Sequence, residues 1–291
     1  MQTIRIGTRQ SRLALIQAEL LADYIRHSCP GLRAELVAMK TTGDKILDRK
    51  LDEIGGKGLF VKELDCALRE GRSDVSVHSL KDVPAAVPRD LPLLGFSCRA
   101  DARDVLVLPK GADVLDTLRP LGCSSARRTV QLRRLFPKME IKSIRGNVLT
   151  RLEKLDQGQY GGLVLAAAGL KRLGLEERIS RYFSVEELVP AAGQGILAVQ
   201  GRQGEEYGYL EGFFDTDSTY CALAERSFIR TLEGGCSSPL AAYAAMEAQG
   251  KMKLTGMYAK EGSLEFYIDS VTGWKEEAEK LGRELAVKMR R

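Results

Sequence analysis

The stretch richest in reactive side chains is VSVHSLKDVP, residues 75–84. An expected strand delivers Ser79, Lys81 and Asp82 at its carboxyl end, and Pro84 ends the strand because proline has no N–H to donate. On an open surface, Lys81 and Asp82 would form an ion pair of little energetic value. In a crevice, Lys81 would supply a cation for a carboxylate, and Asp82 would supply a carboxylate for a developing cation. Asp82 is therefore our candidate catalytic residue.

Three more stretches place basic and hydroxyl side chains where expected strands end and helices begin. Helix N-termini bind anions well because they have free N–H groups and a positive dipole end. Arginine adds a planar fork of donors that matches a carboxylate or a phosphate. Since the ligand crevice of an open α/β sheet lies outside the carboxyl ends of its strands, we expect a cleft for an acidic ligand. The residues are Arg9 and Ser11 in the first turn, Ser124, Ser125, Arg127 and Arg128 in the second, and Arg145, Asn147 and Arg151 in the third.

These basic stretches also fit less specific roles. Each turn, taken alone, is more simply understood as a solvated helix start with surface arginines. Nucleic acid is a competing partner, but the stretches lack the interleaved aromatic residues on which bases stack. The sequence GGKGLF, residues 55–60, departs from the Walker pattern of a phosphate-binding loop. We interpret it as a mobile loop that carries one cation, Lys57.

A single cysteine, Cys236, follows two glycines in TLEGGCSSPL, residues 231–240. Gly234 and Gly235 favour the end of a helix, because glycine adopts left-handed backbone angles without steric cost. Pro239 then prevents the helix from resuming. We expect Cys236 on a tight turn. From the residues alone, a buried small hydrophobe remains the commoner role for a cysteine.

The composition is typical of a soluble globular protein. Hydrophobic residues make up 44% and charged residues 29%, and the net charge is +5, which is far from the balance of a strongly basic nucleic-acid-binding protein. Charges interrupt every apolar run and no signal peptide is recognisable at the N-terminus, so we expect a cytoplasmic chain that does not enter a membrane. The six cysteines form no CxxC pair and only two histidines are present, so no metal site is expected. A single histidine such as His78 is more often a packed core residue than a catalyst.

The elements that would position these residues alternate between strand and helix over the first two thirds of the chain. Such alternation predicts α/β domains with parallel sheets. The expected strands cover residues 3–8, 34–41, 74–80, 91–98, 104–109, 140–146 and 161–169, and the expected helices run from Ser11 toward His27, from about 59 to 70, around 124–136 and onward from Asn147.

The remaining third of the sequence has a different character. Residues 188–200 are expected to lead the chain back to the first α/β unit. Residues 201–218, rich in Gly, Glu and aromatics, are typical of a linker or crossover. A helix over about 219–232, strands within 251–259 and 263–270, and a terminal helix from Trp274 predict a small α+β domain.

Eight short stretches, in the same order, resemble the porphobilinogen deaminase family, whose members are also called hydroxymethylbilane synthases. One such stretch would be a weak signal, whereas eight in order are a strong one. The resemblance covers residues from about 3 to 240 and weakens beyond. The stretches are RIGTRQSRLAL, GGKGLFVKEL, VHSLKDVP, SSARRTVQL, RGNVLTRLEKLD, LAAAGLKRLGL, AAGQG and LEGGC.

The resemblance implies a fold and an activity. The fold would be two α/β domains like those of periplasmic binding proteins, with a cleft between them, plus a small C-terminal α+β domain. The activity would be that of a transferase of tetrapyrrole and haem biosynthesis, which joins four porphobilinogen molecules head to tail onto a dipyrromethane cofactor, loses ammonia at each step, and releases hydroxymethylbilane. A monomer passing its product to uroporphyrinogen-III synthase is implied, without nucleic-acid or membrane binding. The implied domains are residues 1–98 with 193–213, residues 99–192, and residues 214–291.

The resemblance also implies a role for individual residues. Cys236 stands where the family attaches its cofactor through a thioether, and Asp82 stands where the family has its catalytic carboxylate. Basic and polar side chains would hold the carboxylates of the pyrrole rings. The implied cofactor-binding residues are Lys81, Ser125, Arg127, Arg128, Arg145, Asn147 and Gln194, and the implied substrate-binding residues are Arg9, Ser11, Lys57, Ser79, Ser124, Arg151 and Arg172.

Some positions depart from the family pattern. Cys123 replaces a frequent threonine, Gln200 replaces a frequent acidic residue, and Ser237 and Ser238 replace a more apolar pair. Two other functions remain open on the residues alone, namely a solute-binding or anion-sensing module of the same two-lobed fold and a nucleic-acid-binding protein. A binding module has no evident use for Asp82 beside a lysine or for a cysteine on a glycine turn.

Overall fold

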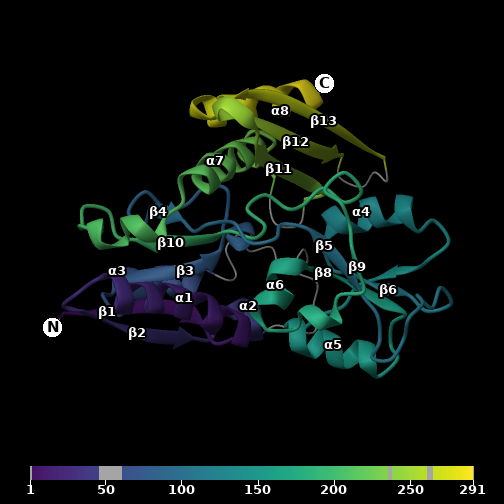
Figure 1. Cartoon of the computed structure of the whole chain (residues 1–291), viewed down its shortest axis with the longest axis horizontal. Coiled ribbons are helices and arrows are strands. Elements are labelled where there is room, and N and C mark those ends of the chain that lie inside the picture. The colour runs from purple at the N-terminus through teal and green to yellow at the C-terminus, as the bar shows by residue number, and fades with distance from the viewer. Residues whose placement is uncertain (1, 46–60, 235–237, 261–264, 291) are drawn as a thin grey trace.

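The computed structural model describes residues 2–45, 61–234, 238–260 and 265–290. Three sheets, each with helices packed against it, make up the described chain (Figure 1). The first two are five-stranded, with the strand orders β2-β1-β3-β10-β4 and β7-β6-β8-β5-β9, and the third is β11-β12-β13. The predicted class, two α/β units followed by a small α+β unit, is confirmed. Its division at the stated residue boundaries stays a prediction.

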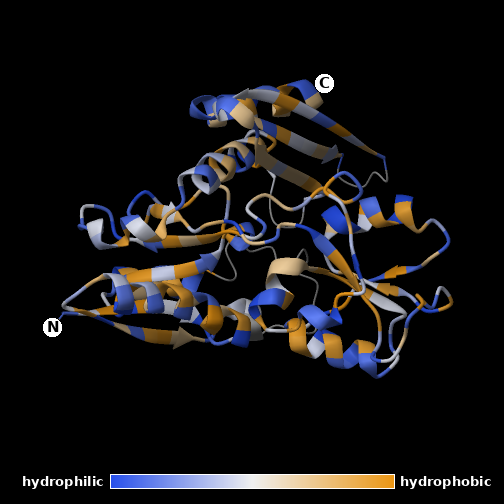
Figure 2. Cartoon of the chain, viewed as in Figure 1, coloured by the Kyte–Doolittle hydropathy of each residue, from blue (hydrophilic) through white to orange (hydrophobic). Residues whose placement is uncertain are grey.

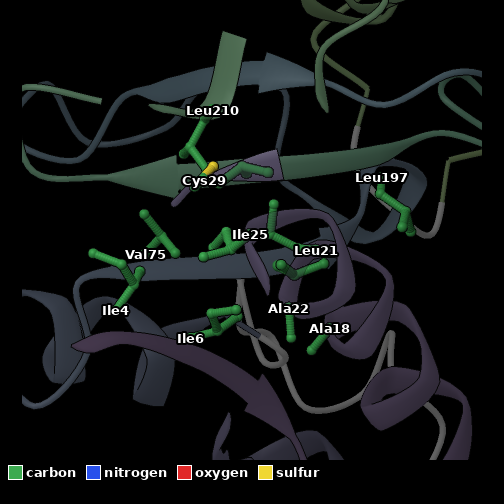
Figure 3. Close-up of a cluster of buried hydrophobic side chains, with 12 residues drawn as sticks. Ile4, Ile6, Ala18, Leu21, Ala22, Ile25, Cys29, Val75, Leu197 and Leu210 are labelled. Carbon is green, nitrogen blue, oxygen red and sulfur yellow. The ribbon is translucent and has the colours of Figure 1, made fainter. Parts of the chain in front are cut away.

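The first sheet packs against α1 through a buried apolar cluster that includes Ile4, Ile6, Leu21 and Ile25 (Figure 3). β1 is parallel to β2 and β3, whereas β10 is antiparallel to both β3 and β4. The strands are β1 (Gln2–Arg9), β2 (Leu32–Met39), β3 (Val75–Ser79), β4 (Leu93–Phe96) and β10 (Leu197–Gly201), and the helices are α1 (Arg12–Ser28), α2 (Thr42–Lys45) and α3 (Lys62–Arg69).

The second sheet is also mixed, because β5 is antiparallel to β8 and β9 while β6 is parallel to β7 and β8. The expected parallel pairing is therefore confirmed for the pairs of β1 and β6 with their neighbours, and it is wrong for the pairs that β10 and β5 make. In the first unit, the reason is that β10 returns from the second unit and enters between β3 and β4 in the opposite direction. The elements are β5 (Asp104–Val107), β6 (Leu121–Gly122), β7 (Ile141–Lys142), β8 (Gly162–Ala166), β9 (Arg181–Tyr182), α4 (Ala126–Leu135), α5 (Val148–Asp156) and α6 (Ala167–Arg172).

The third sheet is antiparallel and packs against two helices on one face. On the other face, Ala241 and Met257 contact Val130 of α4 and the nearby Val189, which fixes the third unit against the second. Figure 2 shows hydrophilic and hydrophobic bands alternating along the helices, as expected for helices that pack one face against a sheet. The elements are α7 (Thr216–Thr231), β11 (Leu240–Met246), β12 (Lys251–Ala259), β13 (Phe266–Trp274) and α8 (Ala278–Arg290).

The stretch over residues 201–218 connects β10 of the first unit to α7 of the third, but it is a packed segment and not an extended linker. Its residues 208–213 form a 3₁₀ helix, and Leu210 is fully buried in the core of the first unit. The backbone carbonyl of Tyr209 accepts a hydrogen bond from Cys29 Sγ at 3.2 Å. The aromatic side chains that suggested a crossover are therefore packing residues of the first unit.

The three units meet at Glu225 of α7, whose side chain is completely buried. Its carboxylate accepts hydrogen bonds from Arg99 Nη2 and from the backbone N–H groups of Gly193 and Ala244, each at 2.7 Å. Arg99 and Gly193 lie in the two segments that connect the first sheet to the second, and Ala244 lies in β11. One carboxylate thus joins both connections to the third unit. No helix in the described ranges is long and apolar enough to cross a bilayer.

Candidate active site

Asp82 ends a short 3₁₀ turn, Leu80–Asp82, that follows β3 directly. The turn is held on both sides of its charged residues. Before them, the Leu80 N–H donates to the carbonyl of Ile196 at 3.0 Å, and after them, the side chain of Val83 is buried together with that of Leu80. Lys81 and Asp82 remain partly exposed. The local fold therefore presents both charged groups from a fixed turn, as the sequence predicts.

Lys81 lies within electrostatic reach of groups from the second unit. Burial lowers the pKa of Lys81 to about 8, Asp82 and Asp104 act to raise this pKa, and Arg128 and Arg127 act to lower it. Asp82 and Lys81 follow a strand of the first sheet, whereas Asp104 begins β5 and the two arginines lie in α4. The structure thus brings residues of two units together at one charged site.

Asp104 is the centre of this site and was not predicted. Its fully buried carboxylate accepts hydrogen bonds from Arg127 Nη1 at 2.7 Å, Arg128 Nη2 at 2.6 Å and Gln194 Nε2 at 2.7 Å. Burial alone would raise the pKa of Asp104, but the charges and hydrogen bonds of Arg127 and Arg128 hold this pKa far below its usual range. The one signal in the sequence was an acidic residue, Asp104, at the start of the apolar strand DVLVLP.

The two arginines are bound to the protein more fully than we expected. Arg127 Nη1 also donates to the carbonyl of Val189 at 2.6 Å, and Arg128 Nη1 donates to that of Val164 at 3.1 Å. Only 5% and 8% of their side-chain surfaces are exposed. Their buried Nε atoms, however, have no hydrogen-bond partner among the described residues. Two cations share one carboxylate here, so the three charged side chains together keep a net positive charge. Contact of either arginine with a ligand stays a prediction.

Three of the predicted hydroxyl and amide residues cap helices. Ser11 accepts a hydrogen bond from the N–H of Ala14 at 3.3 Å, and Asn147 accepts one from that of Thr150 at 3.0 Å. Ser125 caps α4 in the same way. The predicted positions of these helix starts are confirmed. Any contact of the three side chains with a ligand stays a prediction.

Two other predicted serines hold neighbouring protein groups. Gln17 Nε2 of α1 donates to Ser79 Oγ at 2.9 Å. Ser124 Oγ accepts from the N–H of Ile144 at 3.0 Å and donates to the carbonyl of the same residue. These contacts fix the ends of β3 and β6 relative to their neighbours, and a role of the two serines toward substrate stays a prediction.

Arg151 lies near the cluster around Asp104. Its Nε donates to the carbonyl of Gly146 at 2.8 Å. Burial lowers the pKa of Arg151, the charges of Arg128 and Arg145 lower it further, and Asp82 acts in the opposite direction. Arg151 therefore faces the same charged region as the catalytic candidate, from the start of α5.

The remaining predicted cations are more dispersed. Arg172 Nη2 donates to the carbonyl of Gly195 at 2.7 Å, and burial lowers the pKa of Arg172 to about 10. The charge of Arg9 acts on His78, whose own pKa burial lowers to about 4. His78 is buried with its Nε2 at 3.0 Å from Gln200 Oε1, so its interpretation as a core residue is confirmed.

Two predicted site residues, Cys236 and Lys57, lie outside the described residues. Cys123, which departs from the family pattern, is buried among apolar side chains with its Sγ at 3.8 Å from the carbonyl of Ser125. It therefore packs beneath the start of α4.

The sequence matches two family models. Residues 4–208 match the model described as "Porphobilinogen deaminase, dipyromethane cofactor binding domain", and residues 219–291 match "Porphobilinogen deaminase, C-terminal domain". The chain belongs to the porphobilinogen deaminase family. The resemblance seen in the short motifs is thereby confirmed.

Curated relatives extend over nearly the whole chain. The porphobilinogen deaminase of Acetivibrio thermocellus is 53% identical over 98% of this chain and 97% of its own length. That of Alkaliphilus oremlandii is 50% identical over 99% of this chain and 96% of its own length. Among solved structures, the methionine-binding protein MetQ matches 77% of this chain and 94% of its own, with 15% identity and a TM-score of 0.45.

The donor set of the site suits the dipyrromethane cofactor of the family. Each pyrrole ring carries acetate and propionate groups, so the cofactor needs several cations close together. Lys81, Arg127, Arg128 and Arg151 outnumber the carboxylates of Asp82 and Asp104 by two charges. The buried Nε atoms of Arg127 and Arg128 have no hydrogen-bond partner among the described residues.

Proposed function

We propose that this chain is an active hydroxymethylbilane synthase, which joins four porphobilinogen molecules head to tail with loss of ammonia and releases hydroxymethylbilane. One observation carries the proposal: a carboxylate, Asp82, stands on a fixed turn within electrostatic reach of Lys81, Arg128 and Arg151. Cations for carboxylates and a carboxylate for a developing cation are the groups that this reaction needs in one place.

The residues divide the work between binding and charge stabilisation. Cys236 would hold the dipyrromethane cofactor through a thioether, and this group would supply the nucleophilic pyrrole carbon for the first substrate. Lys81, Arg128 and Arg151 bind acetate and propionate groups of the rings. Asp82 faces the pyrrole N–H of the substrate and stabilises the positive charge that develops there as ammonia leaves. A preorganised charge is effective at such a point because it needs no reorganisation during the reaction.

We further infer that the enzyme acts as a cytoplasmic monomer and passes hydroxymethylbilane to uroporphyrinogen-III synthase. The ordinary composition of the chain supports the cytoplasmic location. The monomer and the recipient of the product are inferred from the family resemblance alone. Light scattering of the purified protein measures its oligomeric state, and a molar mass near twice that of the chain would contradict the monomer.

Turnover of an Asp82→Asn variant tests the catalytic assignment. Asparagine keeps the size and one oxygen of the side chain but removes the charge. With cofactor supplied from preformed hydroxymethylbilane, we expect turnover to fall about 10²–10³-fold, or roughly 2.7–4 kcal/mol of barrier. Asp82→Glu should retain more activity, because it keeps the charge at a slightly wrong reach. If the cofactor-carrying Asp82→Asn variant turns over porphobilinogen within a few-fold of the parental rate, Asp82 is not the catalytic carboxylate.

Intact mass spectrometry tests the cofactor assignment separately. The purified chain should be heavier than its sequence by two linked pyrroles, and Ehrlich's aldehyde reagent should stain it. Cys236→Ser should remove both signals. Active protein with the bare sequence mass would contradict a covalent cofactor, and inactive protein with that mass would favour the solute-binding alternative.

A further inference from the structure

Arg226 of α7 binds the backbone that directly follows the catalytic turn. Its Nη2 donates to the carbonyl oxygens of Pro84 at 2.8 Å and Ala85 at 3.1 Å, and its Nη1 donates to that of Val83 at 3.5 Å. No backbone N–H in the described ranges donates to any of these three carbonyls. One side chain of the third unit therefore holds the exit of the turn that carries Asp82.

The guanidinium of Arg226 relies on these carbonyls rather than on an acid. Its side chain is partly buried, and no ion pair of Arg226 occurs within the part of the chain that the structure describes. Burial and, to a smaller extent, the charge of Arg230 lower the pKa of Arg226 to about 10, and no carboxylate among the described residues is a main contributor in the opposite direction. Because a buried charge is tolerated only when it is well hydrogen-bonded, the three carbonyls account for an arginine at this position.

The same face of α7 makes an apolar contact with the turn. Ala222, one helical turn before Arg226, is fully buried in a cluster that contains Leu80 and Val83. Residues four positions apart lie on one face of a helix, so both contacts come from the side of α7 that faces the first unit (Figure 1). In the sequence, Asp82 therefore lies between Leu80 and Val83, and α7 contacts both of these residues.

We propose that Arg226 is a positioning residue, which sets the location of the Asp82 carboxylate by fixing the carbonyls of Val83, Pro84 and Ala85. This inference rests on the proposed function. The planar fork of arginine can donate to three carbonyls at once, which a single ammonium group does less well. The helix that carries Arg226 ends at Thr231, five residues before Cys236. The helix that precedes the cofactor cysteine thus also orients the catalytic turn.

Kinetics of cofactor-loaded variants test this proposal. We expect Arg226→Gln to carry the full cofactor mass and to lower kcat about 10–100-fold, since small misplacements of a catalytic group have effects of this size. KM should change little, because the carboxylate-binding residues are untouched. Arg226→Lys should recover part of kcat. The matched control is Arg230→Gln, since Arg230 is exposed on the same helix, pairs with Glu279 at 3.0 Å, and should leave kcat at the parental value.

A double-mutant cycle separates positioning from general stability. If Arg226 acts through Asp82, Arg226→Gln should lower kcat far less in an Asp82→Asn background than in the parent. Equal losses in both backgrounds, or parental kcat in loaded Arg226→Gln, would overturn the inference while the role of Asp82 stands. Near-parental turnover of Asp82→Asn alone would overturn the role of Asp82 and this inference with it. If Arg226→Gln does not fold, Arg226→Lys takes its place in the cycle under the same criteria.

Discussion

Two completely buried carboxylates join parts of this molecule, and they have opposite electrostatic character. Asp104 binds two arginines and one amide, with three hydrogen bonds of 2.6–2.7 Å. Glu225 binds one arginine and two backbone N–H groups, with three hydrogen bonds of 2.7 Å. The number of hydrogen bonds and their lengths are nearly the same, so the difference lies in the number of cations.

The pKa values of the two groups follow this difference. Burial raises the pKa of Glu225, and the single charge of Arg99 with the two N–H groups does not offset it. Burial also acts to raise the pKa of Asp104, but two arginines reverse the effect. Glu225 therefore links chain segments at an electrostatic cost, whereas Asp104 is stabilised as an anion and fixes the positions of two arginines.

Asp104→Asn should have the largest effect on stability. Removing the charge leaves Arg127 and Arg128 buried beside a neutral amide, and breaking a buried ion pair typically costs about 3–5 kcal/mol of unfolding free energy. We also expect poor cofactor assembly, because both arginines lose their common anchor. Urea unfolding and intact mass measure the two effects. A variant with parental stability and full cofactor mass would show that Asp104 does not organise the pair.

Glu225→Gln should cost less. The glutamine oxygen can still accept from Arg99 and Ala244, and only the N–H of Gly193 loses its acceptor, which typically costs about 1–3 kcal/mol. Urea unfolding at neutral pH gives the comparison, and a loss larger than that of Asp104→Asn would contradict our view that cation number separates the two sites.

The losses of unfolding free energy in Asp104→Asn and Glu225→Gln should change with pH in opposite directions. The folded-state pKa of Asp104 is lowered, so its contribution to stability is present above its unfolded pKa of about 3.9 and is lost as pH falls further. The folded-state pKa of Glu225 is raised, so the parent loses stability as pH rises above about 4.3, the unfolded value. The cost of Asp104→Asn should therefore shrink toward acid pH, whereas that of Glu225→Gln should shrink toward neutral pH. Unfolding curves at several pH values between about 2 and 7 test both signs, because the Asp104 contribution changes only below its unfolded pKa and that of Glu225 only above its own.

Lys81 gives a local measure of the same contrast. Its pKa is about 8, and Asp104 is one of the main charges that raise this pKa, whereas Glu225 is not among the main groups that act on it. In cofactor-free Cys236→Ser protein, the pH dependence of Lys81 acetylation, followed by peptide mass spectrometry, should give this value. Adding Asp104→Asn should lower the pKa, and adding Glu225→Gln should leave it unchanged. An unchanged pKa with Asp104→Asn would place that charge outside the reach of Lys81.

The sequence predicted what depends on local pattern. A short polar residue before a stretch with helical periodicity predicts the helix starts at Ser11, Ser125 and Asn147. Polar residues after an apolar strand predict the turn that follows β3. The family motifs then supplied candidate roles for side chains that local pattern alone leaves open.

What the sequence did not predict depends on contacts between distant segments. Asp104 and Arg127 are 23 positions apart, and Glu225 and Gly193 are 32 positions apart, so neither contact has a local pattern. A buried carboxylate in a helix has the same sequence appearance as an exposed one. The sequence also did not predict that β10 is antiparallel to its neighbours, because strand direction depends on pairing between distant segments. It did not predict β11 either, because this strand is rich in alanine and is stabilised by its pairing with β12 and by burial.

The smallest expected effect concerns the caps of α4 and α5. Asn147 accepts from the Thr150 N–H at 3.0 Å, whereas Ser125 accepts from the Arg128 N–H at 3.5 Å. Replacing a capping residue by alanine typically costs about 1 kcal/mol, and a long bond should cost less. We expect Asn147→Ala to reduce the unfolding free energy by about 1 kcal/mol and Ser125→Ala by about 0.5 kcal/mol, at the low end for caps.

The contribution of the Ser125 cap to stability should depend on Asp104. The start of α4 is held by its own side chains, since Arg127 and Arg128 both bind Asp104, so the Ser125 cap adds little in the parent. In Asp104→Asn, that anchor is lost and α4 should depend more on its cap. Ser125→Ala should then cost about 1 kcal/mol, the ordinary value for a cap, while Asn147→Ala should cost the same in both backgrounds. Urea unfolding of the parent, of Asp104→Asn and of each cap variant in both backgrounds measures this coupling. Equal costs of Ser125→Ala in both backgrounds would mean that Asp104 does not anchor α4.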